Sequence, residues 1–219
     1  MAELRVLVVG TRRCGTGYLA HCLERSGVTC GHEAIFHHWS EQRVRARLLN
    51  STVEAESSWA AAPFLDAGWL PSGVKVIHLT RSPVRVVKSF HDINFFSEQR
   101  AQKPLNQIVY RNTSIQPETQ GRMTSSVTHY YEWNALIVDR LKAAGRPSLM
   151  LRLEDLVSAT AAKDALSSFL GMDIVLPEEV TNLKMSEKEA QGAAHYDASA
   201  ALSLMQAASQ RFGTFGYPL

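Results

Sequence analysis

The chain has 219 residues, enough to bury a sizeable hydrophobic core, and α/β domains of about 200–250 residues are common. We therefore expect a single domain over residues 1–219. Lysine and arginine number 23 against 21 aspartates and glutamates, and the resulting net charge of +2 is too small to indicate a nucleic-acid partner.

The cysteines and the N-terminus bear on the cellular compartment. Cys14, Cys22 and Cys30 are odd in number and lack metal-ligand spacing, which indicates reduced thiols and no metal site. The first strand signal begins within a few residues of Met1, which leaves no room for a signal peptide, and no apolar run approaches membrane-spanning length. These features favour a cytoplasmic protein with no membrane span.

Hydrophobic patterning along the chain predicts strands that alternate with helices. The strand segments are 4–10, 28–31, 74–79 and 148–153. The helical segments are 15–26, 40–49, a helix that begins at Pro83, 123–144, 160–170 and 196–210. The alanine-rich stretch near 55–68 has no clear register, and residues 97–120 read as a binding loop or lid because they are polar and lack a period. This order predicts a three-layer α/β/α fold with a mainly parallel central sheet, whose ligands bind at the carboxyl ends of the strands.

The first strand leads into a glycine-rich turn followed by a helix, an arrangement that presents backbone N–H groups and the positive end of a helix to an anion. Gly10 and Gly15 hold the spacing of a Walker loop, but Thr16 stands in place of its lysine and Gly17 in place of its magnesium-binding hydroxyl. We therefore expect an anion site that works without a metal.

Arginine side chains supply positive charge to this turn and to a second turn like it. Arg12 and Arg13 lie within the first turn, and Arg81 follows the strand at 74–79, with Ser89 two helical turns further on. If the two strands are neighbours, the turns lie side by side and suit a ligand with two phosphate groups separated by a ribose.

These residues resemble the motifs of sulfotransferases that use 3′-phosphoadenosine 5′-phosphosulfate (PAPS), whose domain is of the P-loop type. Gly-Thr-Arg-Arg-Cys-Gly-Thr-Gly (10–17) resembles the family's 5′-phosphosulfate loop, and Leu-Thr-Arg-Ser-Pro-Val-Arg-Val-Val-Lys-Ser (79–89) its 3′-phosphate motif. Cys-Gly-His-Glu (30–33) resembles a segment of tyrosylprotein sulfotransferases, and residues 151–156 and 168–171 resemble two downstream elements. In the first loop Arg12 stands for the family's proline, so Arg13 inherits the role of the cation.

The resemblance implies transfer of a sulfuryl group from PAPS to an acceptor hydroxyl, with no metal. It places the leaving-group contacts at Arg13 and Thr16 and the general base at Glu33, with His32 as second choice. The expected nucleotide contacts are Arg12, Arg13, Cys14, Gly15, Thr16, Gly17, Tyr18, Arg81 and Ser89. Lys184 and Arg211 are candidates for contacts from the C-terminal segment.

Other interpretations remain open at this stage. A nucleotide-dependent kinase would need the Walker lysine and hydroxyl, and a non-catalytic nucleotide-binding protein would bind the ligand without turnover. Cys14 is either a low-pKa nucleophile or, lacking an identified histidine partner, a small filler side chain, which we favour. Glu154 and Asp155 are adjacent in sequence and do not face each other, so we assign them a structural role.

The acceptor is a small molecule or a glycan-like compound whose pocket we place in residues 34–65 and 92–125. The aromatic side chains in these segments are Phe36, Trp39, Phe95, Phe96 and Tyr110. His37, His38 and Trp39 either line this pocket or lie on the surface. The aromatic stripe at His129, Tyr130, Tyr131 and Trp133 has helical spacing, which is typical of core residues.

Overall fold

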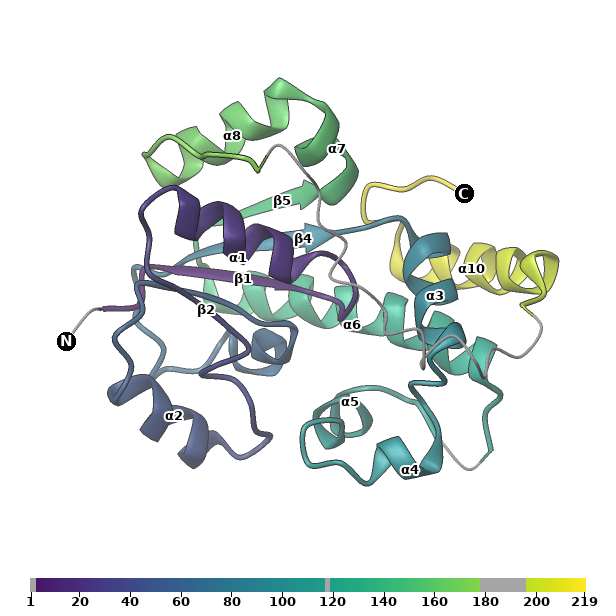
Figure 1. The fold of residues 1–219 in the computed structure, drawn as a ribbon. Helices are drawn as coiled ribbons and strands as arrows, with labels where there is room; N and C mark the ends of the chain where they lie inside the picture. Colours follow the sequence, from purple (N-terminus) through teal and green to yellow (C-terminus); the bar gives the residue numbers. More distant parts are fainter. Residues whose placement is uncertain (1–2, 117–118, 178–195) are drawn as a thin grey trace.

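A computed structural model describes residues 3–116, 119–177 and 196–219 of the chain (Figure 1). Its centre is a five-stranded sheet in the order β2-β3-β1-β4-β5, in which every pairing is parallel. The strands are β1 (Val6–Gly10), β2 (Cys30–His32), β3 (Ala55–Ser57), β4 (Lys75–Thr80) and β5 (Ser148–Arg152). The predicted parallel sheet is therefore confirmed.

Strand β1, in the middle of the sheet, is buried on both faces. Along β1, Leu7 and Val9 belong to one hydrophobic cluster and Val6 and Val8 to the other, as the alternation of side chains in a strand requires. This double burial explains why β1 reads as a continuous apolar run rather than as an alternating pattern.

Helices cover both faces of the sheet (Figure 1). One layer contains α6 (Arg122–Ala144), which packs against α3 (Pro83–Asp92), α10 (Ala198–Phe212) and the 3₁₀ helix η1 (Trp59–Phe64). The other layer contains α1 (Thr16–Arg25), α7 (Leu153–Ser158) and α8 (Thr160–Leu170). The His129–Trp133 stripe of α6 is buried in the first layer, as expected of core residues.

Three segments differ from the sequence-based expectation. The stretch near 55–68 contains β3, which lies between β2 and β1 in the sheet, followed by η1. The segment 97–120 is not irregular throughout, because it forms the short helices α4 (Glu98–Ala101) and α5 (Gln107–Asn112). The second strand covers Cys30–His32 rather than 28–31, so His32 ends a strand that pairs with β3.

The remaining helix is α2 (Glu41–Leu49), which follows β2 and lies near the predicted range of 40–49. None of the described helices is long and apolar enough to cross a membrane.

Candidate functional site

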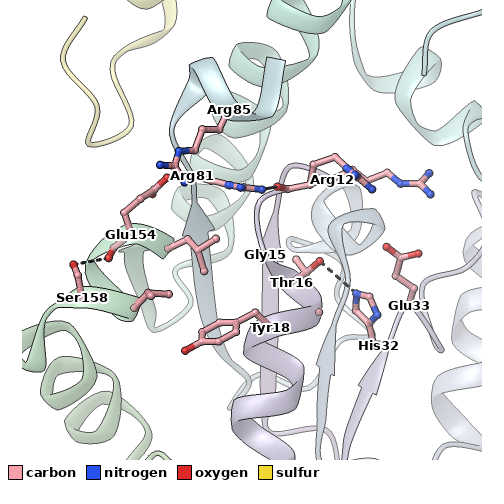
Figure 2. A pocket seen from close by; sticks show the side chains of 14 residues that line it. Arg12, Gly15, Thr16, Tyr18, His32, Glu33, Arg81, Arg85, Glu154 and Ser158 are labelled. Carbon is pink, nitrogen blue, oxygen red and sulfur yellow. Dashed lines mark hydrogen bonds between the residues drawn. The ribbon is translucent and has the colours of Figure 1, made fainter. Parts of the chain in front are cut away.

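A cavity of about 660 Å³ opens where β1, β2, β4 and β5 end, at the carboxyl edge of the sheet (Figure 2). Four segments line it: the β1–α1 turn with the start of α1, the end of β2, the start of α3, and α7. The lining residues are Arg12, Arg13, Gly15, Thr16, Gly17, Tyr18, His32, Glu33, Arg81, Arg85, Leu153, Glu154, Val157 and Ser158. Glu33 and His32 lie at one end of this cavity and Glu154 and Ser158 at the other.

Two glycines shape the first turn. A Cβ atom on Gly10 would lie 2.2 Å from the Leu79 carbonyl oxygen and 2.5 Å from the Cys14 sulfur. Gly15 has a φ of 103° and approaches the Leu153 side chain, so a side chain there would be strained and would collide. The glycines of the phosphate-loop pattern are thus required by the close approach of β1 to β4 and of α1 to α7.

The start of α1 is free of features that would compete with an anion. No acidic residue lies in its first turn, and its N-cap residue, Gly15, has no side chain that could accept from the first N–H groups. The Thr16 hydroxyl lies 3.4 Å from His32 Nε2, and the Thr16 carbonyl accepts a 2.8 Å hydrogen bond from the Ser57 hydroxyl. The N–H groups at the start of a helix and the helix dipole together attract negative charge.

The two arginine-bearing turns are joined directly. Strands β1 and β4 are paired, so the expected adjacency of the turns is confirmed. Arg81 donates from Nη1 to the Arg13 carbonyl oxygen at 3.0 Å, and Arg13 donates from Nε to the Ser89 hydroxyl at 2.9 Å. Tyr130 of α6 donates its hydroxyl to the Arg81 carbonyl at 2.9 Å. Ser89 is thus brought to Arg13 rather than to the wall of the cavity.

Arg12 points toward aromatic rings. Its guanidinium carbon lies 5.0 Å from the centre of the Phe95 ring and 5.7 Å from that of Trp59, distances at which cation–π attraction operates. Arg12 therefore connects the β1–α1 turn to the segment after β3 and the segment after α3.

The segment that carries Glu33 is held by a buried carboxylate on β3. Glu33 has a positive φ of 55°, and its N–H donates to the Ser57 carbonyl at 3.1 Å. Glu56 Oε1 accepts hydrogen bonds from the backbone N–H groups of Ala34 at 2.7 Å and Ile35 at 3.0 Å. Burial raises the pKa of Glu56 to about 7, opposed by these N–H groups and reinforced by the charge of Glu33.

Cys14, expected among the nucleotide contacts, turns its side chain into the core instead. It is fully buried, and burial raises the pKa of its thiol to about 12. A thiol with this pKa carries no thiolate at neutral pH, so the filler role is the one the structure supports. The other first-turn residues named from the sequence line the cavity, as do Tyr18 and Arg81.

Sequence reasoning missed the wall formed by α7 and one residue of α3. Glu154 was assigned a structural role and has one, since its Oε1 accepts from the Ser82 N–H at 3.2 Å and its Oε2 from the Tyr217 hydroxyl. It also lines the cavity together with Val157 and Ser158. Arg85 follows Arg81 by one helical turn, and this spacing was the signal available in the sequence.

The two candidates from the C-terminal segment were Arg211, which is not among the residues that line the cavity, and Lys184. Arg211 lies over the Phe212 ring at 4.8 Å, and Lys184 belongs to the undescribed part of the chain. Among the acceptor candidates, Phe36, Phe95 and Phe96 are buried and Trp39 is exposed. Within residues 3–116, 119–177 and 196–219, no group of three or more histidine, cysteine, aspartate or glutamate side chains could hold a metal ion.

Comparison with known sequences gives no match to any family model and no significant match to a curated protein. Solved structures give matches. The mouse sulfotransferase SULT7A1 complexed with PAP has 14% identity and a TM-score of 0.48, with 95% of this chain and 65% of that chain covered. The sulfotransferase from Alicyclobacillus acidocaldarius has 15% identity and a TM-score of 0.54, with 100% of this chain and 98% of that chain covered. The chain therefore shares the fold of the Alicyclobacillus sulfotransferase over its full length.

Proposed function

We propose that this protein is a sulfotransferase that moves a sulfuryl group from PAPS to a hydroxyl of an acceptor. The observation that carries the proposal is the pair of joined arginine-bearing turns on a cavity that ends at Glu33. The shared fold with a sulfotransferase supports the same activity. The Walker lysine and its neighbouring hydroxyl are absent from the turn, which argues against metal-dependent phosphoryl transfer.

In this proposal the two phosphate groups of the donor take separate positions in the cavity. The N–H groups at the start of α1, with Thr16 and Arg13, would hold the 5′-phosphosulfate end. Arg81 would hold the 3′-phosphate, because it follows β4 immediately and its neighbour Arg13 is already fixed by Ser89. The α7 wall would then flank the nucleoside, and its Leu153 and Val157 side chains supply an apolar surface there.

The chemistry requires one proton acceptor and one group that stabilises the leaving oxygen. The acceptor oxygen attacks the sulfur, the bond from sulfur to the phosphate oxygen breaks, and adenosine 3′,5′-bisphosphate (PAP) leaves. We assign the removal of the hydroxyl proton to Glu33, with His32 as the alternative, since both side chains line the same end of the cavity. Arg13 and Thr16 stabilise the charge that develops on the leaving phosphate.

Thermal unfolding with ligands tests this function before an acceptor is known. PAP without magnesium at 100 times its dissociation constant should stabilise the fold by about 2.7 kcal/mol, which for a chain of this size raises the midpoint by about 5–10 °C. Adenosine 5′-monophosphate, which lacks the 3′-phosphate, should give a smaller shift at the same concentration. A shift with ATP and magnesium but not with PAP would favour a kinase-like function. No shift with PAP and none with ATP and magnesium would overturn the proposal that the protein binds a nucleotide.

A further inference from the structure

Two arginines of α2 lie against the segment that carries Glu33. Arg47 donates from Nη1 to the Ala34 carbonyl at 3.2 Å, one residue from Glu33. Arg43 lies four residues earlier, and its Nη1 is 3.2 Å from His38 Nε2. Residues four apart share a face of a helix, so both side chains lie on the face of α2 that contacts Ala34 and His38, in the segment that follows Glu33.

A third arginine, from α5, contacts the same segment. The Arg111 guanidinium carbon lies 4.3 Å above the centre of the Trp39 ring, which joins α5 to the loop before α2. Trp39 is 42% exposed and packs beside His38, with ring centres 5.4 Å apart. We call Arg43, Arg47 and Arg111 the arginine rim.

The arginine rim lacks acidic partners in the described part of the chain. Its contacts are a carbonyl, an imidazole and an indole ring, and none of the salt bridges found in the described residues includes any of the three. Glu41 is the one carboxylate within residues 34–50. The pKa of His38 is lowered, by burial first and then by the positive charges of Arg43 and Arg47.

Clustered like charges repel one another, and this repulsion is relieved when an anion binds among them. Guanidinium groups bind carboxylate and sulfate oxygens through paired N–H donors. On the basis of the function proposed above, we propose that the acceptor carries a carboxylate or sulfate group beside its hydroxyls, and that the arginine rim binds this group while a hydroxyl reaches Glu33.

A matched pair of sugars tests the proposal by calorimetry on the protein saturated with PAP, so that the phosphate sites are occupied. The probes are para-nitrophenyl β-D-glucuronide and para-nitrophenyl β-D-glucoside, which differ in the carboxylate. The glucuronide should bind at least tenfold more tightly. Arg43→Gln, Arg47→Gln and Arg111→Gln combined should reduce this preference to less than twofold, and the single variant Arg111→Gln should reduce it in part.

Arg45→Gln is the control, because Arg45 is exposed on the same helix between Arg43 and Arg47 and faces away from both. It should keep the full preference for the glucuronide. Equal binding of the two sugars, no measurable binding of the glucuronide, or a preference that survives in the combined variant would overturn the proposal. PAP titrations of the same proteins distinguish failure of the acceptor proposal from failure of the proposed function. If the wild type binds PAP but shows no preference between the sugars, the proposed function stands and the acceptor proposal fails. If the wild type does not bind PAP, the proposed function fails.

Discussion

The two ends of the cavity are built from different kinds of contact. At the end that we propose binds the nucleotide, called the nucleotide end below, hydrogen bonds join residues far apart in sequence, such as Arg13 with Ser89 and Glu154 with Tyr217. At the Glu33 end, which we propose binds the acceptor and call the acceptor end, the side-chain hydrogen bonds of residues 34–40 other than those to Glu56 join closer neighbours, such as His38 with Arg43, and many of the side chains are exposed. The comparison indicates that the nucleotide end is held by long-range contacts of the fold, whereas residues 34–40 of the acceptor end depend more on local contacts.

The largest expected effect is on the rate of transfer, and it should come from the Glu33 end of the cavity alone. Glu33→Gln should lower the rate of sulfuryl transfer by about 10²–10⁴-fold, the usual contribution of a general base. The dissociation constant for PAP should change by less than twofold, because the residues that we assign to the phosphate groups lie in the β1–α1 turn and after β4. Transfer from labelled PAPS and calorimetry with PAP measure the two quantities.

Glu41→Gln is the control for this variant, since Glu41 is exposed at the start of α2. It should leave both transfer and PAP binding unchanged. Full activity in Glu33→Gln would remove Glu33 from the mechanism and make His32 the candidate base.

The next effect concerns the stability contributed by Glu56, which anchors residues 34–35 to strand β3. The raised pKa of Glu56 means that its ionisation opposes folding, so its contribution to stability is lost as pH rises from about 4.5 through 7. Glu56→Gln cannot ionise and keeps an oxygen for the Ala34 and Ile35 N–H groups. Its free energy of unfolding relative to wild type should therefore increase between pH 5 and pH 8, by up to about 3 kcal/mol.

Urea unfolding at the two pH values measures this change. Glu54→Gln, two residues earlier and partly exposed in a salt bridge with Arg5, should show no such pH-dependent gain. A constant difference between Glu56→Gln and wild type across this pH range would show that the Glu56 carboxyl has the same pKa in the folded and the unfolded protein.

A smaller effect tests the nucleotide end. Arg81→Ala should weaken PAP binding by about 1.5–3 kcal/mol, the contribution of a hydrogen bond to a charged group. Adenosine 5′-monophosphate should lose much less affinity, because it lacks the phosphate that we assign to Arg81. Calorimetry with both ligands gives the comparison, with Arg85→Ala as a neighbouring variant that removes an arginine from the same wall. Equal losses for the two ligands would mean that Arg81 acts on the turn, through the Arg13 carbonyl, rather than on the 3′-phosphate.

The same contrast explains how far the sequence could predict the structure. The paired turns at Arg13 and Arg81 were predictable because glycine spacing, a buried strand and a helix start all lie within short segments. Strand β3 was missed because it has three residues, Ala-Glu-Ser, with no apolar pattern and a buried carboxylate. The inward turn of Cys14 was not predictable, since it depends on how closely β1 and β4 approach at Gly10.

The α7 wall of the cavity was missed for a related reason. Val157 and Ser158 face the cavity only because β5 pairs with β4, and this neighbour relation is a property of the assembled sheet. The helices α4 and α5 have four and six residues, too short for a helical period to be recognised in the sequence.

The smallest effect tests whether long-range bonds hold the nucleotide end. Tyr217→Phe removes the hydroxyl that donates to Glu154 and should lower the free energy of unfolding by about 1 kcal/mol, seen as a decrease of about 2–4 °C in the thermal midpoint. Tyr110→Phe is the matched control, because the Tyr110 hydroxyl is buried without a hydrogen-bond partner in the described residues and its removal should cost nothing. Both variants lose the same atom from a phenol, so a difference between them measures the hydrogen bonds of the Tyr217 hydroxyl, to Glu154 and to the Thr80 carbonyl at 3.5 Å. Equal midpoints for the two variants would mean that these bonds contribute nothing and that packing alone fixes the α7 wall.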